Sequence, residues 1–399
     1  MEQIDLKPGD TLCKQGDLAT EIYILLEGSL DVCTRDKRGR DKVISNISGK
    51  HSIFGEIGAL LKRPRGSTLR ASQHCVIQKV DTRMKSLDET ILAQPRLGLS
   101  ISTNLARYLA NTNVRLSQYT QFLAALRKFV DDSLLYYYNK SKSLGDLYEQ
   151  TKTSWVKTIF DKAKSHVCYA MGETVSRGQE PVADDSQPPP PEAATQSPEI
   201  PTDKADEREF QPGDTLGREG EEGREIFILE SGVLEIQVGG RKVSEVKDKG
   251  CVIGEVAVLA GYATKKFEKR SATIVAREPS TAIVIDAKKL ETAIAANPQI
   301  ILFITKVLSN RLPGTNHAFV SDDERIAKYL AMLDASGYND KTLIHAYDLL
   351  RTNLQSIAKD KAETQGYAEE VQAKLAEMKD RSAAFHDDYE QLTKRWKPI

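Results

Sequence analysis

A repeated segment is the feature that most limits what this chain of 399 residues can fold into. Residues 7–32 align without a gap on residues 211–236, and 12 of the 26 aligned positions are identical. The two copies are 204 residues apart here, so each copy has room for a whole domain rather than a short solenoid repeat. We therefore expect two domains of the same fold.

Short apolar runs within each copy alternate with turn-forming residues. Ile22, Ile24 and Leu26 show the two-residue period of a half-buried strand, and Gly-Asp and Glu-Gly pairs mark the turns between such runs. Many short strands at this spacing predict two packed sheets in a β jelly roll. Helical periodicity follows each copy, so the predicted fold class is α+β, with long helices after each jelly roll.

The helical stretches carry apolar residues in alternating steps of four and three, which is a heptad seam. The first seam runs from Leu105 to Tyr137, and the second runs from Leu350 to Trp396. Such a seam forms either a helical hairpin within one chain or a coiled coil between two chains, and the pattern fits both. We expect helical modules that pair within the chain or assemble a homodimer.

Residues 179–209 lie between the two halves and contain seven prolines and nine acidic residues. This composition predicts a disordered Pro-rich acidic linker. The predicted segments are the first β domain at 1–100, a helical module at 101–178, the linker at 179–209, the second β domain at 210–300 and a second helical module at 301–399.

The composition excludes several classes of function. A net charge of −1, from 56 basic and 57 acidic residues, gives no general attraction to nucleic acid. No basic leader opens the chain and no apolar stretch approaches about eighteen residues, so we expect a cytoplasmic protein without membrane contact. Five scattered cysteines suit reduced thiols, and the six histidines lack metal-binding spacing. Kinase and cyclase motifs are missing, so we expect no catalytic residues, no metal and no cofactor.

The segment FGEIGALLKRPRGSTLRA at residues 54–71 carries residue types that hold a sugar joined to a phosphate. Gly55 permits close approach of the backbone, and Glu56 offers a carboxylate to a ribose hydroxyl. Arg65 supplies a planar fork that matches two phosphate oxygens. A surface ion pair between Glu56 and Arg65 would not by itself explain the residues around them. The candidate ligand-binding residues are Gly55, Glu56, Ile57, Arg65, Gly66 and Ser67.

This pattern resembles the phosphate-binding cassette of the cyclic nucleotide-binding domain family. The family includes catabolite-activator-type regulators and the regulatory subunits of cAMP-dependent protein kinase. The nine-residue step from Glu56 to Arg65 matches the family, whereas Gly58 stands where many members have Ala. The other matching residues include Pro8, Gly9, Asp10, Gly16, Asp17, Gly28, Phe54, Pro64, Thr68 and Ala71.

The resemblance implies a role for each cassette residue. Glu56 would accept a hydrogen bond from the ribose 2′-hydroxyl, and Arg65 would bind the phosphate. The neighbouring glycines and Ser67 would surround the phosphate with backbone groups and a hydroxyl. Members that select cGMP tend to have Thr where this chain has Gly66, so cAMP is the expected ligand and cGMP the alternative. The candidates for contact with the base, on the helix that follows, are Asn111, Thr112 and Asn113.

The second copy departs from the family pattern. The step from Glu255 to Arg270 is fifteen residues, and Lys269 stands where the family has Pro. Arg270 reaches a phosphate only if the inserted residues bulge outward; otherwise Lys265 or Lys266 replaces it, or the domain is degenerate and kept for packing. The candidate ligand-binding residues of this copy are Gly254, Glu255, Arg270, Ser271 and Ala272.

The sequence therefore predicts a non-enzymatic cAMP receptor whose ligand repositions helical modules that dimerise or dock an unidentified protein partner. Two alternatives stay open: a scaffold whose domains have lost their ligand, and a cAMP-responsive DNA-binding regulator. Residues 322–350 have only a weak helix-turn-helix pattern, and the basic residues of 35–42 are interspersed with acidic ones. Nucleic acid is therefore the least favoured partner.

Overall fold

The computed structural model describes residues 2–35, 39–181, 207–262, 266–333 and 342–358, together with 377, 380–381, 384–385, 387–392 and 394. Parts of several predictions fall outside these residues: the basic run at 36–38, the linker at 182–206, Lys265 of the second cassette, the helix-turn-helix pattern at 334–341, and the second seam at 359–376, 378, 382 and 396. The chain divides into a first unit, Met1–Leu116 with Pro188–Val320, and a second unit, Ser117–Gln187 with Ser321–Ile399. The predicted segment boundaries remain predictions.

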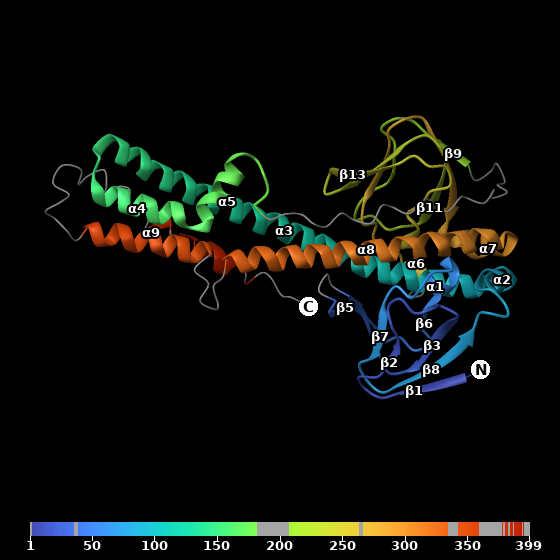
Figure 1. Cartoon of the computed structure of the whole chain (residues 1–399). Helices are drawn as coiled ribbons and strands as arrows, with labels where there is room; N and C mark the ends of the chain where they lie inside the picture. The colour runs from blue at the N-terminus through green and yellow to red at the C-terminus, as the bar shows by residue number, and fades with distance from the viewer. Residues whose placement is uncertain are drawn as a thin grey trace. The chain divides into compact units, whose positions relative to one another are not determined.

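The first β domain consists of two four-stranded antiparallel sheets (Figure 1). Their strand orders are β1-β8-β3-β6 and β2-β7-β4-β5. Apolar side chains from strands of both sheets form one core, in which Leu25, Leu30 and Ile77 are fully buried. The elements are β1 (Glu2–Leu6), β2 (Thr11–Cys13), β3 (Glu21–Glu27), β4 (Leu30–Arg35), β5 (Asp41–Ile47), β6 (Ile53–Phe54), α1 (Glu56–Leu61), β7 (Thr68–Ala71), β8 (Cys75–Asp81) and α2 (Leu87–Ala93).

The second β domain repeats this topology strand for strand. Its sheets have the orders β9-β16-β11-β14 and β10-β15-β12-β13. Even the register shift in the third strand recurs, between Leu25 and Glu27 in one copy and between Leu229 and Ser231 in the other. The prediction of two jelly-roll domains is thereby confirmed. The elements are β9 (Glu207–Phe210), β10 (Thr215–Gly217), β11 (Glu225–Ser231), β12 (Leu234–Val238), β13 (Arg241–Val246), β14 (Val252–Ile253), α6 (Glu255–Tyr262), β15 (Thr273–Ala276) and β16 (Ser280–Asp286).

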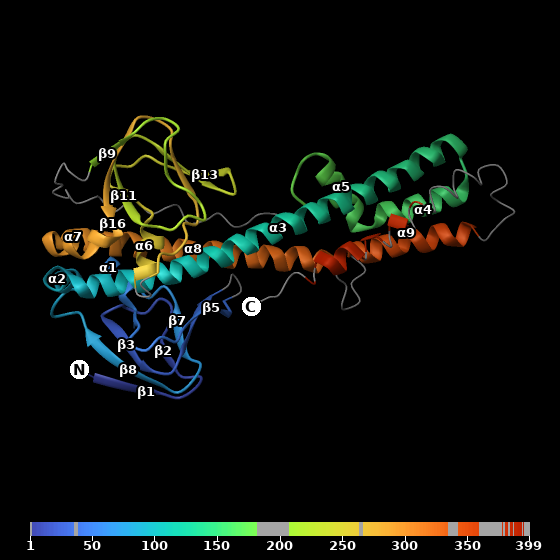
Figure 2. The same ribbon diagram turned by 180° about the vertical axis from the view of Figure 1, so that it is seen from behind.

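A short helix and then a long helix follow each β domain. In the first copy α2 precedes α3 (Pro95–Thr151); in the second, η2 (Ala287–Lys289) and α7 (Leu290–Ala296) precede α8 (Pro298–Leu333). Within the first unit the β domains lie on opposite sides of α3 and α8, as Figures 1 and 2 show. Apolar residues of both copies share one core there.

A buried hydrogen bond marks where these two helices meet. The hydroxyl groups of Ser102 and Thr305 lie 2.6 Å apart, and both residues are fully buried. Ser102 is seven residues after Pro95 and Thr305 is seven residues after Pro298, so the bond joins equivalent positions of the two copies. The copies therefore pack as a pseudo-symmetric pair.

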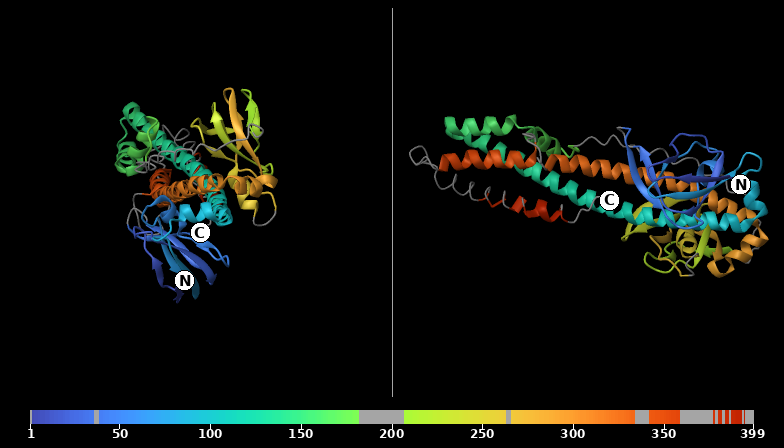
Figure 3. Two further views of the ribbon diagram at one scale, coloured as in Figure 1. Left: turned by 90° about the vertical axis from the view of Figure 1, so that its right-hand side faces the viewer. Right: turned by 90° about the horizontal axis from the view of Figure 1, so that it is seen from below.

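The second unit is helical (Figure 3). It contains α4 (Ser154–Ser165), α5 (Val167–Ser176) and α9 (Leu343–Ala358), together with part of α3. The Tyr137 hydroxyl donates to the Ala163 carbonyl over 3.1 Å, and the Tyr347 hydroxyl donates to the Ser133 carbonyl over 3.0 Å. These bonds satisfy tyrosine hydroxyls that the helix packing buries.

The first predicted seam is covered by the chain itself. Of its ten positions Leu116 is half-buried, and the other nine are buried: Leu105, Leu109, Thr112, Tyr119, Leu123, Leu126, Val130, Ser133 and Tyr137. The apolar stripe of α3 therefore packs within one chain along its whole length.

Two features concern the described ranges as a whole, namely membrane-spanning helices and metal-binding clusters. No single helix there is long and apolar enough to cross a membrane; only the bent pair Ala287–Ala296 and Pro298–Leu333 passes when taken together. The same residues contain no group of three or more His, Cys, Asp or Glu side chains placed to hold a metal ion. None of the five cysteines forms a disulfide bond, and four of them are buried.

Candidate functional site

The first cassette begins at a glycine whose backbone only glycine adopts readily. Gly55 has a φ of 78° and caps α1, and a Cβ atom there would lie 2.7 Å from Nη1 of Arg65. The left-handed turn directs the chain from β6 into α1 and leaves room for the guanidinium group. It also places Glu56 in the first turn, where its side chain is 3% exposed.

The loop before β3 holds Arg65 in place. Its backbone N–H donates to the Asp17 carbonyl over 2.8 Å, and its carbonyl accepts from the Gly16 N–H over 2.8 Å. The guanidinium group donates from Nη1 to the Gly55 carbonyl and from Nη2 to the Glu21 carbonyl, over 2.7 Å in both cases. It also lies 5.1 Å from the ring centre of Tyr23.

One donor of this arginine stays unsatisfied. Arg65 is 5% exposed, and its Nε–H has no hydrogen-bond partner among the described residues. A buried, charged N–H without an acceptor costs free energy, so such groups usually mark a site for an external acceptor. The geometry therefore fits an anion that binds beside Arg65.

Burial dominates the electrostatics of Glu56. Loss of solvation raises the pKa of this carboxyl group to about 7, although its own backbone N–H and the charge of Arg65 both act to lower it. Tyr108 of α3 lies close to it and hydrogen-bonds Ser52; burial, reinforced by the charge of Glu56, raises the pKa of Tyr108 to about 12. The first cassette thus presents a carboxyl group that exchanges its proton near neutral pH.

The second cassette preserves the backbone of the first. The Arg270 N–H donates to the Glu221 carbonyl over 2.7 Å and its carbonyl accepts from the Gly220 N–H over 2.9 Å, the counterparts of the bonds at Arg65. Its Nη2 donates to the Glu225 carbonyl over 3.0 Å. Nη1 is buried and has no partner in the described part of the chain.

The described residues of the insertion in the second cassette, 266–269, are exposed to solvent. Lys266, Phe267, Glu268 and Lys269 are all exposed, whereas Arg270 is 7% exposed. The Gly223 N–H donates to the Glu268 carbonyl over 2.8 Å and closes the base of the loop. Arg270 therefore stays in its cassette and lines the cavity, whereas Lys266 does not line it.

Both cassettes open on one cavity of about 1230 Å³ within the first unit. The walls come from the two cassettes and from α3 and α8. All predicted ligand-binding residues line it: Gly55, Glu56, Ile57, Arg65, Gly66, Ser67, Gly254, Glu255, Arg270, Ser271 and Ala272.

Comparison with known proteins identifies the β domains. The family model described as the cyclic nucleotide-binding domain matches residues 3–84 and 207–297. Both β domains belong to the cyclic nucleotide-binding family. Each copy therefore has the fold of a cyclic nucleotide-binding domain, as the cassette motif predicts.

Three relatives show how far the similarity extends. The cGMP-dependent protein kinase of Plasmodium berghei is 25% identical over 303 residues, which are 76% of this chain and 24% of the kinase. The cAMP-activated global transcriptional regulator CRP of Pasteurella multocida is 29% identical over 108 residues, 27% of this chain and 50% of the regulator. The regulatory domain of Toxoplasma gondii PKA with cAMP aligns over 78% of this chain and 84% of that chain, with 16% identity and a TM-score of 0.22.

The chain thus spans no more than half the length of these curated relatives.

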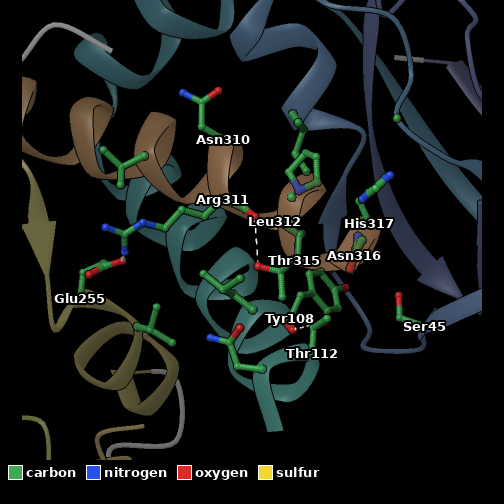
Figure 4. Close-up of a pocket in the computed structure, with 18 of the residues that line it drawn as sticks. Ser45, Tyr108, Thr112, Glu255, Asn310, Arg311, Leu312, Thr315, Asn316 and His317 are labelled. Atoms are coloured by element: carbon green, nitrogen blue, oxygen red, sulfur yellow. Dashed lines mark hydrogen bonds and ion pairs between the residues drawn. The ribbon is translucent and has the colours of Figure 1, made fainter. Parts of the chain in front are cut away.

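One residue of the second cyclic nucleotide-binding domain was not predicted from its motif. Arg311 of α8 forms an ion pair with Glu255, which is 1% exposed, and donates to the Val252 carbonyl over 2.5 Å (Figure 4). The other carboxylate oxygen of Glu255 has no partner among the described residues. Arg311 lies thirteen residues after Pro298, as Tyr108 lies thirteen after Pro95, so aligning the two helices would have revealed it.

Two of the three residues predicted to contact the base line the cavity, and the third faces solvent. Thr112 and Asn113 line the cavity, whereas Asn111 is exposed and does not. Thr112 donates its hydroxyl to the Tyr108 carbonyl over 2.8 Å, which leaves its oxygen free to accept. Thr315 makes the matching bond to Arg311 in α8 over 3.1 Å, as Figure 4 shows. The Thr-Asn pair is thus repeated on both helices.

Proposed function

We propose that this chain is a non-enzymatic, cytoplasmic receptor for a cyclic nucleotide, with cAMP as the preferred ligand and cGMP as the alternative. One observation supports it most. The buried arginine of each cassette keeps a guanidinium N–H without an acceptor, and a buried carboxyl group lines the same cavity. Arginine and carboxyl group are complementary to the two ends of a ribose phosphate.

Different residues of the first cassette would bind different parts of the ligand. Arg65 would bind the cyclic phosphate through its unsatisfied donor, and Glu56 would accept the ribose 2′-hydroxyl. Gly55, Ile57, Gly66 and Ser67 would surround the phosphate with backbone groups and a hydroxyl. Nothing lies within 4 Å of a Cβ atom at Gly66, so the cradle is open at that point.

The second cassette would bind a ligand of the same kind. Gly254, Ser271 and Ala272 occupy the corresponding wall, and Arg270 holds its place despite the insertion. Arg311 pairs with one carboxylate oxygen of Glu255, so the other oxygen would accept a hydrogen bond from the ribose hydroxyl. We therefore include both domains in the proposal.

Ligand binding would act through a change in the arrangement of α3 and α8. The cavity is lined by α3 and α8, both of which also contribute residues to the helical unit. A ligand that binds one arrangement of these helices better than another shifts the population toward it. The helical modules would pass this shift to a partner chain, either a second copy or another protein.

Titration calorimetry of nucleotide-free protein with cAMP and then cGMP tests the proposal. At a ligand concentration about 100-fold above Kd, binding adds about 2.7 kcal/mol to stability, so thermal unfolding gives an independent reading. We expect Arg65→Ala and Arg270→Ala each to remove one of two sites. Arg83→Ala, which removes an exposed arginine paired with Asp81, is the matched control. No heat and no change in Tm with either nucleotide would overturn the proposal.

A ligand-free scaffold remains the second candidate because of a specific observation. Arg65 already donates to two backbone carbonyls, and Glu255 already has a cationic partner in Arg311. These internal bonds would stabilise empty cassettes. In that case Arg65→Ala lowers the Tm of the protein alone, and cyclic nucleotides leave the Tm of the wild type unchanged.

A further inference from the structure

Two histidine rings meet in the helical unit, at the corner where α4 ends and α5 begins. His166 caps the end of α4 and the start of α5, and it is 8% exposed. Its Nε2 lies 3.4 Å from Nδ1 of His345 on α9, and the two ring centres are 5.5 Å apart. We call these two residues the histidine pair. The pair lies wholly in the second unit, outside both cassettes.

The backbone of α5 decides which nitrogen of His166 carries the proton. The Cys168 N–H donates to Nδ1 of His166 over 3.2 Å, so Nδ1 holds a lone pair. The proton of the neutral ring is therefore on Nε2, and this N–H donates to Nδ1 of His345. The proton of a neutral His345 is then on its own Nε2. Each ring thus uses its one basic nitrogen as a hydrogen-bond acceptor.

A further proton on either ring would break one of these two hydrogen bonds. On His166 it would occupy Nδ1, which faces the Cys168 N–H; on His345 it would occupy Nδ1, which faces the Nε2–H of His166. Two donors that face each other lose their bond, and the loss at His166 also removes the cap of α5. A metal ion on Nε2 of His166 would force the proton onto the same Nδ1. The pair is therefore arranged to respond to protons rather than to a metal.

The titratable groups packed against the pair from the other helices are neutral. Tyr137 of α3 meets the ring of His166 edge-on at 5.9 Å, and Tyr347 of α9 lies 6.3 Å from Tyr137. Burial raises the pKa of both tyrosines, and it raises the pKa of Cys168 of α5 to about 12. None of these three groups therefore offers a negative charge to a protonated His166 between pH 5 and 8.

The charged groups closest along the chain already have partners. Lys162, one turn before His166 on α4, donates to Asn353 over 3.4 Å and adds positive charge to this side of the pair. Asp348, one turn after His345 on α9, pairs with Arg351 over 3.0 Å. The one carboxylate near the pair on α9 is thus balanced by its own cation.

We propose that the histidine pair is a pH-sensitive contact that holds α9 against the corner of α4 and α5 while both rings are neutral, and that weakens when either ring is protonated. Histidine is the side chain that ordinarily changes charge between pH 5 and 8. The open arrangement of α9 takes up protons that the closed arrangement excludes, so acid shifts the population toward it. This inference concerns the helical unit alone and does not depend on a cyclic nucleotide.

Amide hydrogen exchange of α9 in the full chain gives the first test. Exchange rates corrected for their intrinsic pH dependence yield the equilibrium constant for opening of residues 343–358. Between pH 7.5 and 5.5 we expect this constant to rise about 10-fold for each histidine that must stay neutral, because a free histidine has a pKa of about 6.5. EDTA is present throughout, so that no metal ion contributes. An opening constant that does not change over this range overturns the proposal.

Two substitutions remove the titration and keep hydrogen-bonding groups in place. The amide oxygen in His166→Asn still caps α5, and the amide oxygen in His345→Gln still accepts from Nε2–H of His166. We expect each variant to lose about 10-fold of the pH response and the double variant to show none. His51→Asn, at an exposed left-handed position of the first unit, is the control and keeps the wild-type response. A full pH response in the double variant overturns the proposal.

Histidine-selective NMR of the wild type gives a reading that does not depend on the stability of a variant. The signal of His166 is identified by its absence from the spectrum of His166→Asn. We expect it to show a proton on Nε2 alone at pH 7.5, as the bond from Cys168 requires. A proton on Nδ1, or on both nitrogens, at that pH overturns the proposal.

Discussion

The two cyclic nucleotide-binding domains share their strand order and cassette backbone but differ in what faces the cassette carboxyl group. Glu56 lies beside the neutral ring of Tyr108, whereas Glu255 is paired with Arg311. Both partners come from the same position of the long helix that follows. The residue that the following helix places beside the cassette carboxyl group therefore differs between the two copies: a tyrosine in the first and an arginine in the second.

A second difference concerns packing behind the cassette. A Cβ atom on Gly58 would lie 2.4 Å from the Cβ of Ala19, and one on Gly223 would lie 2.4 Å from the Cβ of Ala257. The repeat aligns Ala19 with Gly223 and Gly58 with Ala257. Each copy thus has room for one methyl group at this contact. In the first copy Ala19 of the loop before β3 provides it, and in the second copy Ala257 of α6 provides it. This explains why Gly58 replaces the alanine that many relatives have.

The largest expected effect is on the pH dependence of the free energy of unfolding, and it reports the ionisation of Glu56. Its pKa of about 7 lies above the 4.5 of a free side chain because burial disfavours the ionised form. Between these values the folded state keeps a proton that the unfolded state has released, so stability falls as pH rises from about 4.5 to about 7. The full loss is about 3 kcal/mol. We expect Glu56→Gln to abolish this fall in chemical unfolding, which leaves the variant more stable than the wild type at about pH 8.

Glu27→Gln, at an exposed position, is the control and keeps the wild-type pH profile. Parallel profiles for Glu56→Gln and the wild type would show that Glu56 does not carry the proton.

The next effect tests the counter-charge in the second domain. Arg311→Ala leaves the carboxylate of Glu255 buried and without its cation, which we expect to cost about 2–3 kcal/mol, near the lower end for buried pairs because Arg311 is 40% exposed. Adding Glu255→Gln removes the stranded charge and should recover most of the loss. Unfolding of both single variants and the double variant gives the coupling energy. Additive effects would mean that the pair contributes nothing.

The methyl exchange predicts a smaller effect. Gly58→Ala forces two methyl groups into the space for one, and we expect it to cost about 1–3 kcal/mol. The double variant Ala19→Gly with Gly58→Ala reproduces the arrangement of the second domain and should regain most of that stability. Gly66→Ala, where a Cβ atom meets open space, is the matched control. If Gly58→Ala is tolerated alone, the contact is not tight.

The smallest effect concerns the bond between the equivalent positions of the two helices. Ser102→Ala removes the partner of Thr305, which still donates to the Ile301 carbonyl over 2.6 Å. Because Thr305 keeps one bond, we expect a loss of about 0.5–1.5 kcal/mol. Ser100→Ala, on the exposed side of the same helix, should change the unfolding free energy less. Equal losses for the two variants would remove any special role for this contact.

Most of the fold and the cassette residues could be predicted from the sequence because they obey local rules. The period of two in β3, the Gly-Asp turns and the step from Glu56 to Arg65 all act over short distances. A repeat 204 residues apart then extends the same reasoning to the second copy.

Contacts between elements that are distant in the sequence could not be predicted from such local patterns. The approach of Arg311 to Glu255 depends on how α8 packs, and a helix pattern gives its apolar face without its partner. The heptad seam of α3 likewise showed an apolar stripe, and only the structure shows that the chain covers it itself. The orientation of Arg65 toward the Gly55 and Glu21 carbonyls depends on tertiary packing in the same way.

The exchanged methyl group has a consequence for anyone who builds chimeras from the two domains. A cassette transplanted by its motif alone, from α1 to β7 or from α6 to β15, would carry one half of the contact without the other. One chimera would hold two methyl groups where one fits, and the reverse chimera would hold none. The smallest interchangeable module therefore includes the loop before the third strand, although that loop contains no residue of the ligand motif.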